Sequence, residues 1–566
     1  MIKFKDMKYV RPDFAEYMSK FKGYLDDMKN AKDKDAFIGA MMNIEHLSRT
    51  LTTLATLVNI RNSINTKDEF YNNEQTVMDE NLPQFAEIGS TMAQIVLSSP
   101  FRKDVEEKFG KHLTEKYALK ATTFKPEIVP DLIEESKLST EYEKFMASAE
   151  IEFEGKTYNL SGMTPFMQST DRQTRKAASD AYWGWLADRV NQLDEFYDKL
   201  VKIRHNIAIK LGFKNFIELA YARMGRTDWT YEDARNYRKQ IYESVVPLAQ
   251  KLYKEQADRL NIHPMKYYDY NLEFLTGNPK PVGEEAYLVE QAKEMYEELS
   301  PLTGEFFNTM INQELMDLTT KPGKRGGGYM TFLPDYKVPF IFSNFNGTSG
   351  DVDVLTHEAG HAFQGYVNRN AEFSDQIDYT MEVAEIHSMS MEFFTHPWMQ
   401  KFFGKDTEKY YYSHVVSCIH FLPYGASIDE FQEWVYLHVD ATPEERRAQY
   451  RKIERKYLPH LEYDDCEYLQ GGGRWQRQMH VYFAPFYYLD YTLSQVCALQ
   501  YFIWDMKDHK KAWESYLHIC ERAGIVPFTE LVKECGLDNP FEDGTIAKIT
   551  PKLEQYLDSL DKSQIK

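Results

Sequence analysis

Apolar residues recur at intervals of three and four along most of the first 320 residues, which is the spacing of one face of an α-helix. The pattern predicts long amphipathic helices over residues 35–66, 172–212 and 231–262. Gly212 is expected to end the second of these helices, and Pro247 is expected to kink the third. No repeat of fixed period is present, which argues against a solenoid.

The pattern changes near residue 320, where glycine, proline and aromatic residues replace the helical spacing. Residues 328–332 (GYMTF) and 339–345 (PFIFSNF) lie between turn residues and are rich in strand-forming types, which predicts two short strands of a small sheet. We therefore expect a mainly α protein with one small sheet. Its expected regions are a largely helical part, 1–320, and a second part, 321–566; the boundary is approximate, and one continuous fold is the alternative.

Composition narrows the class of protein. With 43% hydrophobic and 27% charged residues, the chain is typical of folded globular proteins. Its formal net charge of −20 disfavours nucleic acid and anionic membranes as partners. No stretch approaches the ~18–20 apolar residues of a membrane span, the N-terminal segment lacks the apolar core of a signal peptide, and the five scattered cysteines form no CxxC pair. We expect a cytoplasmic protein, and the sequence gives no indication of its oligomeric state.

The stretch DVLTHEAGHAF, residues 353–363, contains two histidines four positions apart. On a helix, His357 and His361 project from one face a turn apart, so both imidazoles can bind one metal ion. Glu358 is rotated away from this pair and can reach a water molecule on that ion. Gly360 is costly inside a helix, so we expect another part of the chain to pack closely against it. The alternative is a chance match within an ordinary buried helix.

A catalytic zinc ion normally has three protein ligands, and residues 379–397 offer the third. This segment is apolar almost all round, yet Glu385, Ser388 and Glu392 fall on one stripe. A buried glutamate needs a partner, which is either a metal ion or an arginine. The stripe favours Glu385 as the ligand, and Glu382 is the alternative.

Three stretches together resemble the zinc oligopeptidases of the thimet oligopeptidase and oligoendopeptidase F family, above all its bacterial oligoendopeptidase F branch. They are residues 326–366, 382–394 and 474–496. The resemblance implies a prolate, mostly helical zincin-type metallopeptidase with a deep substrate channel. It also implies a zinc-dependent oligoendopeptidase that hydrolyses internal bonds of short, unstructured peptides.

The resemblance also assigns roles to residues of this chain. In the family, the third metal ligand lies in an E-x-x-S-x-x-x-E helix, and the pattern that begins at Glu385 matches it. One zinc ion would therefore be bound by His357, His361 and Glu385. Glu358 would take a proton from the attacking water and deliver a proton to the leaving amine.

A second implied set lies in MHVYFAPFYYLDYTL, residues 479–493. Thimet-type members have a histidine and several tyrosines here, although the spacing from His480 to Tyr491 is one residue shorter in this chain. Pro485 is expected in the first turn of a helix, which would place Tyr488 and Tyr491 on one face. We expect His480, Tyr488 and Tyr491 to stabilise the oxygen that becomes negatively charged. Ordinary core packing of a tyrosine-rich helix is the alternative.

Substrate contacts are expected at four places. An extended peptide can add to the exposed edge of the strand at 339–345 through main-chain hydrogen bonds. Gly327 and Gly328 are expected to let the backbone approach the peptide, as is the second glycine cluster, 471–473; mobile flaps or ordinary loops are the alternatives. Tyr482 is a further candidate for binding substrate.

Two other functions remain open at this point. The first is a zinc exopeptidase, either a dipeptidyl carboxypeptidase or an aminopeptidase, which would use Arg474 and Arg477 to bind a peptide terminus. The second, more remote, is a non-catalytic helical binding protein that holds no metal.

Overall fold

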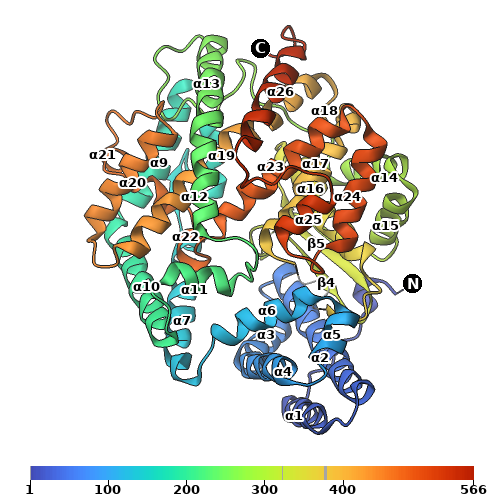
Figure 1. Cartoon of the computed structure of the whole chain (residues 1–566). Helices are drawn as coiled ribbons and strands as arrows, with labels where there is room; N and C mark the ends of the chain where they lie inside the picture. The colour runs from blue at the N-terminus through green and yellow to red at the C-terminus, as the bar shows by residue number, and fades with distance from the viewer. Residues whose placement is uncertain (1, 322, 375–378) are drawn as a thin grey trace. The chain divides into compact units, whose positions relative to one another are not determined.

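The computed structural model describes residues 2–321, 323–374 and 379–566 of the chain. They form two compact units, and most of each unit is α-helical (Figure 1). Unit 1 comprises Met1–Thr122, Lys280–Lys405 and Gln500–Leu537, and unit 2 comprises Thr123–Pro279, Asp406–Leu499 and Asp538–Lys566. The mainly α fold is confirmed. The division suggested near residue 320 falls within the second stretch of unit 1.

The first stretch of unit 1 is a set of amphipathic helices with clear start signals. Asp13, Asp33 and Asp68 each accept a hydrogen bond from the backbone N–H three residues later, which satisfies a free N–H of the first turn. Apolar residues from most of these helices form one buried cluster that includes Phe21 and Met41. The helix predicted over 35–66 is confirmed as α2. The helices are α1 (Phe14–Asn30), α2 (Lys34–Ile64), α3 (Glu69–Asn81), α4 (Ala86–Ser98), α5 (Arg102–Phe109) and α6 (Lys111–Thr122).

A three-stranded sheet lies in the second stretch of unit 1. Its strands β3 (Met316–Thr319), β4 (Tyr329–Leu333) and β5 (Val338–Phe345) have the order β3-β5-β4, with β5 parallel to β3 and antiparallel to β4. The two predicted strands are confirmed as β4 and β5, whereas β3 was not predicted. Because β5 is the central strand, the expectation that it offers an exposed edge is wrong. Among the described residues, β3 and β4 each pair with a strand on one side only.

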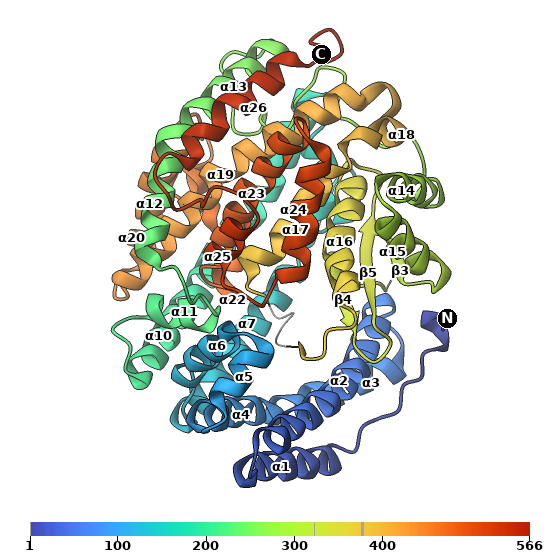
Figure 2. The same ribbon diagram turned by 45° about the vertical axis from the view of Figure 1, so that its right-hand side comes forward.

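Three helices pack together beside this sheet. Helix α16 (Gly350–Val367) packs against β4, β5 and α17 (Met381–Phe394), and α24 (His509–Arg522) packs against both α16 and α17 (Figure 2). The Tyr516 hydroxyl of α24 donates a hydrogen bond of 2.8 Å to the backbone carbonyl of His387. The small sheet therefore lies beside the helix that carries the His-Glu-x-x-His pattern, as expected. The remaining helices of unit 1 include α14 (Glu285–Leu299), α15 (Pro301–Asn312), α18 (Met399–Phe403) and α25 (Phe528–Glu534).

Unit 2 is built around the long helix α19 (Thr407–Leu437). Neither α19 nor any other described helix combines the length and apolar character needed to cross a membrane. A short hairpin of β1 (Ile151–Phe153) and β2 (Lys156–Tyr158) is the only sheet among the described residues of this unit, and it was not predicted. Other helices of unit 2 include α7 (Val129–Ala147), α9 (Arg172–Ala187), α10 (Val190–Leu211), α11 (Phe216–Arg223), α12 (Tyr231–Gln240), α13 (Val246–Leu260), α20 (Pro443–Tyr457), α22 (His480–Phe483) and α26 (Thr545–Ser559).

The helix predictions in unit 2 are confirmed with two refinements. The segment 172–212 forms α9 and α10 in succession, and Gly212 ends α10 in the left-handed conformation with φ of 93°. Pro247 lies in the first turn of α13, after a single π-helical turn at Ile241–Val245. Proline lacks an N–H and clashes with the preceding turn, so the hydrogen-bond ladder is rearranged before it.

The expectation that Pro485 begins a helix is wrong. Helix α23 (Tyr488–Asp505) starts three residues later, and His480 lies within the short helix α22. Phe486 has φ of 67°, a left-handed conformation that an α-helix cannot contain, so the helix cannot begin before it.

Candidate metal centre

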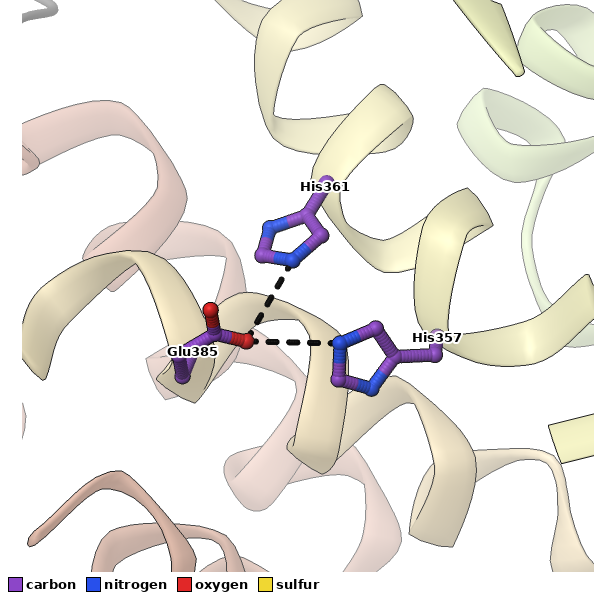
Figure 3. Close-up of side chains that lie close together, drawn as sticks. All are labelled: His357, His361 and Glu385. Atoms are coloured by element: carbon purple, nitrogen blue, oxygen red, sulfur yellow. Dashed lines mark ion pairs between the residues drawn. The ribbon is translucent and has the colours of Figure 1, made fainter. Parts of the chain in front are cut away.

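Two neighbouring helices of unit 1 bring His357, His361 and Glu385 together (Figure 3). The Glu385 Oε2 atom lies 3.3 Å from Nε2 of His357 and 3.4 Å from Nε2 of His361. Two ligands that each lie ~2.0–2.1 Å from one tetrahedral ion are about 3.3–3.4 Å apart. Both measured separations match that spacing, so this donor set fits a zinc-sized cation.

Gly360 allows the two ligand-bearing helices to approach each other. A Cβ atom at this position would lie 2.5 Å from the His387 carbonyl oxygen and 2.7 Å from Cα of Ser388 on α17. Any side chain here would push α16 away from α17. The close packing expected from the glycine is therefore present, and it sets the distance between the histidines and Glu385.

The stripe on α17 supplies positioning contacts as well as the candidate ligand Glu385. Oε1 of Glu392 lies 2.6 Å from Nδ1 of His357, and the Ser388 hydroxyl donates a hydrogen bond of 3.0 Å to Oε2 of Glu385. A proton on Nδ1, directed at Glu392, leaves the Nε2 lone pair of His357 facing Glu385. Sequence reasoning found the stripe but missed these two positioning roles. Glu382, the alternative ligand, is buried, and the cluster of ligand atoms found within the described ranges does not include it.

The electrostatics of the cluster favour a cation. Burial acts against ionisation of Glu385, but His361 and His357 hold its pKa well below the usual range. Burial likewise acts against a charged His357, yet Glu385 and Glu392 raise its pKa well above the ordinary value. One buried carboxylate, Glu385, and one partly buried carboxylate, Glu392, lie beside one imidazole and attract positive charge, which a proton or a metal ion can supply.

Glu358 lies at the edge of the sheet. Its side chain is 9% exposed, and this burial raises the pKa of its carboxyl group. The backbone N–H of Met330 in β4 acts in the opposite direction and lowers this pKa. A carboxylate whose pKa is raised is a stronger base than a fully hydrated one, so Glu358 is suited to accept a proton.

Within unit 2, His480, Tyr488 and Tyr491 are brought together. The His480 ring centroid lies 5.4 Å from that of Tyr488 and 5.7 Å from that of Tyr491. Nε2 of Gln478 lies 2.7 Å from Nδ1 of His480. Burial raises the pKa of Tyr488, so its hydroxyl keeps its proton and remains a hydrogen-bond donor at neutral pH.

Tyr482 lies apart from that group. It is fully buried and stacks on Tyr142 with ring centroids 4.0 Å apart, next to Tyr197 and Trp475. A side chain packed in this way has no surface to offer a peptide, so we do not include Tyr482 in the proposed site.

The first glycine cluster lies in the turn before β4. Gly327 has φ of 90°, a conformation that favours glycine, and its carbonyl accepts a hydrogen bond of 2.8 Å from the Asn344 side chain. A Cβ at Gly328 would lie 3.4 Å from the Phe342 carbonyl oxygen. Both glycines therefore have a structural role at the start of an edge strand, and their contact with substrate stays a prediction.

Comparison with known proteins identifies relatives along the whole chain. Oligopeptidase PepF of Bacillus subtilis (strain 168) is 22% identical over 587 residues, covering 97% of this chain and 83% of PepF. An oligoendopeptidase F homolog of Borreliella burgdorferi is 23% identical over 64% of this chain and 61% of its own. A solved structure of Pz peptidase A with an inhibitor is 47% identical, with a TM-score of 0.95 and full coverage of both chains.

Two family profiles account for most of the sequence. The peptidase M3 N-terminal domain matches residues 4–124, and peptidase family M3 matches residues 165–550. The second match contains every residue of the metal cluster and of the histidine–tyrosine group. The chain therefore belongs to peptidase family M3, and it is a peptidase.

Proposed function

We propose that this chain is a zinc-dependent oligoendopeptidase that hydrolyses internal bonds of short, unstructured peptides. The observation that carries the proposal is the spacing of Glu385 from the two imidazole nitrogens, 3.3 and 3.4 Å. Two histidines and one glutamate form a donor set of catalytic zinc sites, which keep a fourth position open. The family membership and the Pz peptidase A and oligoendopeptidase F relatives support the peptide substrate.

Each residue of the cluster has a distinct part in this reaction. When bound, zinc supplies Lewis acidity, which lowers the pKa of a water molecule toward ~7 and polarises the scissile carbonyl. Glu358 takes the proton of the attacking water and passes a proton to the leaving amine. Glu392 and Ser388 hold His357 and Glu385 in the orientation that ligation needs.

The free edge of β4 is the proposed support for the substrate backbone. An extended peptide placed along β4 would form main-chain hydrogen bonds that make little demand on its sequence. Helix α16, which carries Glu358, packs against β4, so the strand that would align the peptide lies next to the helix of the base. Gly327 and Gly328, directly before β4, leave the start of this edge free of side chains.

His480, Tyr488 and Tyr491 are the proposed donors to the oxygen that becomes negatively charged. The family resemblance supports this role, and the clustering of the three side chains within unit 2 is consistent with it. Preplaced donors of this kind act most strongly where water is excluded.

Zinc quantification combined with product mapping tests the proposal. The purified chain should contain about one zinc per molecule and should cut a peptide whose two ends are both blocked. Mass spectrometry of the products locates the cut. A protein that holds zinc but cuts only peptides with a free end would be an exopeptidase, and a protein without zinc or hydrolysis would contradict the proposal entirely.

A further inference from the structure

The turn between α22 and α23 sets where His480 lies relative to Tyr488 and Tyr491. His480 begins α22, Tyr488 begins α23, and Phe486 lies in the turn between them. Phe486 has φ of 67°, a left-handed conformation that costs free energy for a residue other than glycine. Such a conformation persists only where the surrounding structure holds it. The side chains that hold Phe486 therefore determine the positions of the two tyrosines.

Both main-chain polar groups of Phe486 are bound by buried side chains of unit 2. Its N–H donates a hydrogen bond of 2.9 Å to Oε1 of Gln432 in α19, and its carbonyl oxygen accepts one of 2.9 Å from Nη2 of Arg226. The Phe486 side chain is itself buried, with its ring centroid 5.8 Å from that of Tyr221. The turn cannot rotate without leaving a buried donor or acceptor unpaired, which is costly.

Arg226 also binds the first turn of α23. The same Nη2 atom lies 2.5 Å from Oδ1 of Asp490, and both side chains are completely buried. Successive residues of an α-helix are offset by about 100° around the helix axis, so a fixed direction for Asp490 also fixes the directions of Tyr488 and Tyr491. We call the two contacts of Arg226, with the Phe486 carbonyl and with the Asp490 carboxylate, the Arg226 clamp.

The guanidinium group of Arg226 is itself held in place. Its carbon lies 4.1 Å from the ring centroid of Tyr221 and 4.1 Å from that of Trp229, and the Trp229 ring packs on Phe541 with centroids 4.9 Å apart. A planar guanidinium can stack on aromatic faces while its edge donates hydrogen bonds, which a lysine ammonium cannot do. Arg226 therefore connects the turn rigidly to the core of unit 2.

Stability alone does not account for a charged pair at this place. A buried ion pair can often be replaced by apolar side chains of similar volume without loss of stability. Apolar side chains, however, could neither bind the Phe486 carbonyl nor fix the direction of α23 through Asp490. The contacts that distinguish Arg226 from an apolar residue are thus the ones that orient the start of this helix.

We propose that Arg226 is a positioning residue for peptide hydrolysis. Together with Asp490 it fixes the start of α23, so that Tyr488 and Tyr491 direct their hydroxyl groups at the oxygen that becomes negatively charged. Donors to a transition state must be placed before the reaction, and a misplacement of about 1 Å can cost ~10²-fold in rate. The inference rests on the proposed function and deepens it, because it names what holds the tyrosine donors in place.

Arg226→Lys in the full-length, zinc-loaded chain tests the clamp. Lysine keeps the charge but lacks the planar fork, so kcat should fall by about 10- to 100-fold while KM changes less. Arg175→Lys is the matched control. Arg175 is also buried, lies 2.8 Å from the fully buried Asp269 and donates a hydrogen bond of 2.7 Å to the Ser169 carbonyl, in another part of unit 2. This control should leave kcat unchanged.

A second background separates positioning from a loss of stability. In a chain that already carries Tyr488→Phe and Tyr491→Phe, adding Arg226→Lys should lower kcat little further, because the hydroxyl groups that the clamp positions are gone. A residue with a purely structural role would lower kcat by the same factor in both backgrounds. Urea unfolding of each variant shows which of them are folded under the assay conditions.

Asp490→Asn replaces Arg226→Lys if the latter does not fold. It keeps the size of the side chain and the contact of Arg226 with Phe486, and it weakens only the contact with α23, so the same fall in kcat and the same dependence on the tyrosines are expected. A folded Arg226→Lys protein with normal kcat would overturn the inference. So would a fall in kcat by an equal factor with and without the two tyrosine hydroxyl groups.

Hydrogen exchange provides a readout that does not depend on activity. Backbone amides of residues 486–491 should exchange faster in Arg226→Lys than in the wild-type chain or in Arg175→Lys. Hydrolysis by the wild-type chain is scored separately, because its absence would contradict the proposed function. In that case exchange alone decides on the clamp, and unchanged exchange at the start of α23 would overturn it.

Discussion

The imidazole of His357 lies between two carboxylates, with Nε2 3.3 Å from Glu385 and Nδ1 2.6 Å from Glu392. The ring therefore has one nitrogen for a metal ion and one for a positioning partner. This relationship leads to the first prediction.

Glu392→Gln should weaken zinc binding by about 10- to 100-fold, because an amide no longer draws the Nδ1 proton or raises the basicity of Nε2. Titration against a competing chelator measures the affinity without reference to activity. Glu298→Gln, which alters an exposed glutamate of the same unit, is the control and should leave the affinity unchanged. An unaltered zinc affinity in Glu392→Gln would show that Glu392 does not position the histidine.

Glu358→Gln should abolish turnover while zinc remains bound. The amide keeps the size of the side chain but cannot accept a proton, and the loss of general acid–base catalysis costs about 10²- to 10⁴-fold or more. Steady-state kinetics measures the loss of turnover, and metal analysis of the same sample shows whether zinc is retained. Retained activity would assign the base to another residue.

Gly360→Ala should destabilise unit 1 by about 1–3 kcal/mol, as expected for overpacking, because the new methyl group meets the α17 backbone at 2.5 Å. The same change should lower zinc affinity, since it separates the ligand-bearing helices. Gly39→Ala is a matched control: Gly39 is exposed within α2 and has no atom within 4 Å of an added Cβ.

The control substitution should stabilise the chain by about 0.5–1 kcal/mol, the usual gain from replacing glycine inside a helix. Thermal unfolding followed by calorimetry, with and without zinc, compares the two variants. If Gly360→Ala and Gly39→Ala changed the stability similarly, the packing of α16 against α17 would not depend on the close contact at Gly360.

Acid should destabilise unit 2 through His420. Burial lowers its pKa from 6.5 to about 3, and its ring stacks on Tyr253 with centroids 3.8 Å apart. Below pH 6.5 the unfolded chain takes up a proton that folded His420 refuses, so stability is lost as pH falls from about 6.5 toward 3. At pH 5 this one residue lowers the free energy of unfolding by about 2 kcal/mol.

His420→Phe keeps an aromatic ring against Tyr253 but removes the titration. Urea unfolding, followed by hydrogen exchange of α19, should show a shallower loss of stability between pH 7 and pH 5 in this variant. An unchanged slope would assign the acid sensitivity to other groups.

Tyr491→Phe should lower kcat by roughly 10- to 100-fold and change KM less, because a donor to developing negative charge acts mainly in the transition state. Tyr142→Phe, a change within the buried stack on Tyr482, serves as the control for a purely structural tyrosine. A rise in KM with kcat unchanged would move Tyr491 to substrate binding.

Local patterns predicted the features that depend on local geometry. His357 and His361 share a face of any helix because they are four residues apart. The stripe that begins at Glu385 likewise follows from helical spacing within its own segment. The partner of Gly360 was not predictable, because the His387 carbonyl reaches it through packing between helices. Likewise, nothing in the segment around His480 distinguishes buried Tyr482 from the clustered Tyr488, since their environments depend on residues distant in the sequence.

Sheet details were predicted less completely. Strand β3 has four residues and pairs in parallel with a strand that follows β4, so no turn or alternating pattern marks it. The β1–β2 hairpin did carry a signal, because Glu154 and Gly155 form a tight turn with positive φ values of 49° and 76°. The start of α23 was misplaced because the left-handed Phe486 is a consequence of tertiary packing.

The three-part composition of unit 1 also affects how the chain is made. On the ribosome, α16 and α17 emerge with all three proposed metal ligands before α24, whose Tyr516 bonds the His387 carbonyl, has been synthesised. A nascent or prematurely ended chain thus holds a complete set of ligands on helices that lack part of their covering. Chaperones would then influence the yield of folded protein, since α24 is added to this unit only after both of those helices have been synthesised.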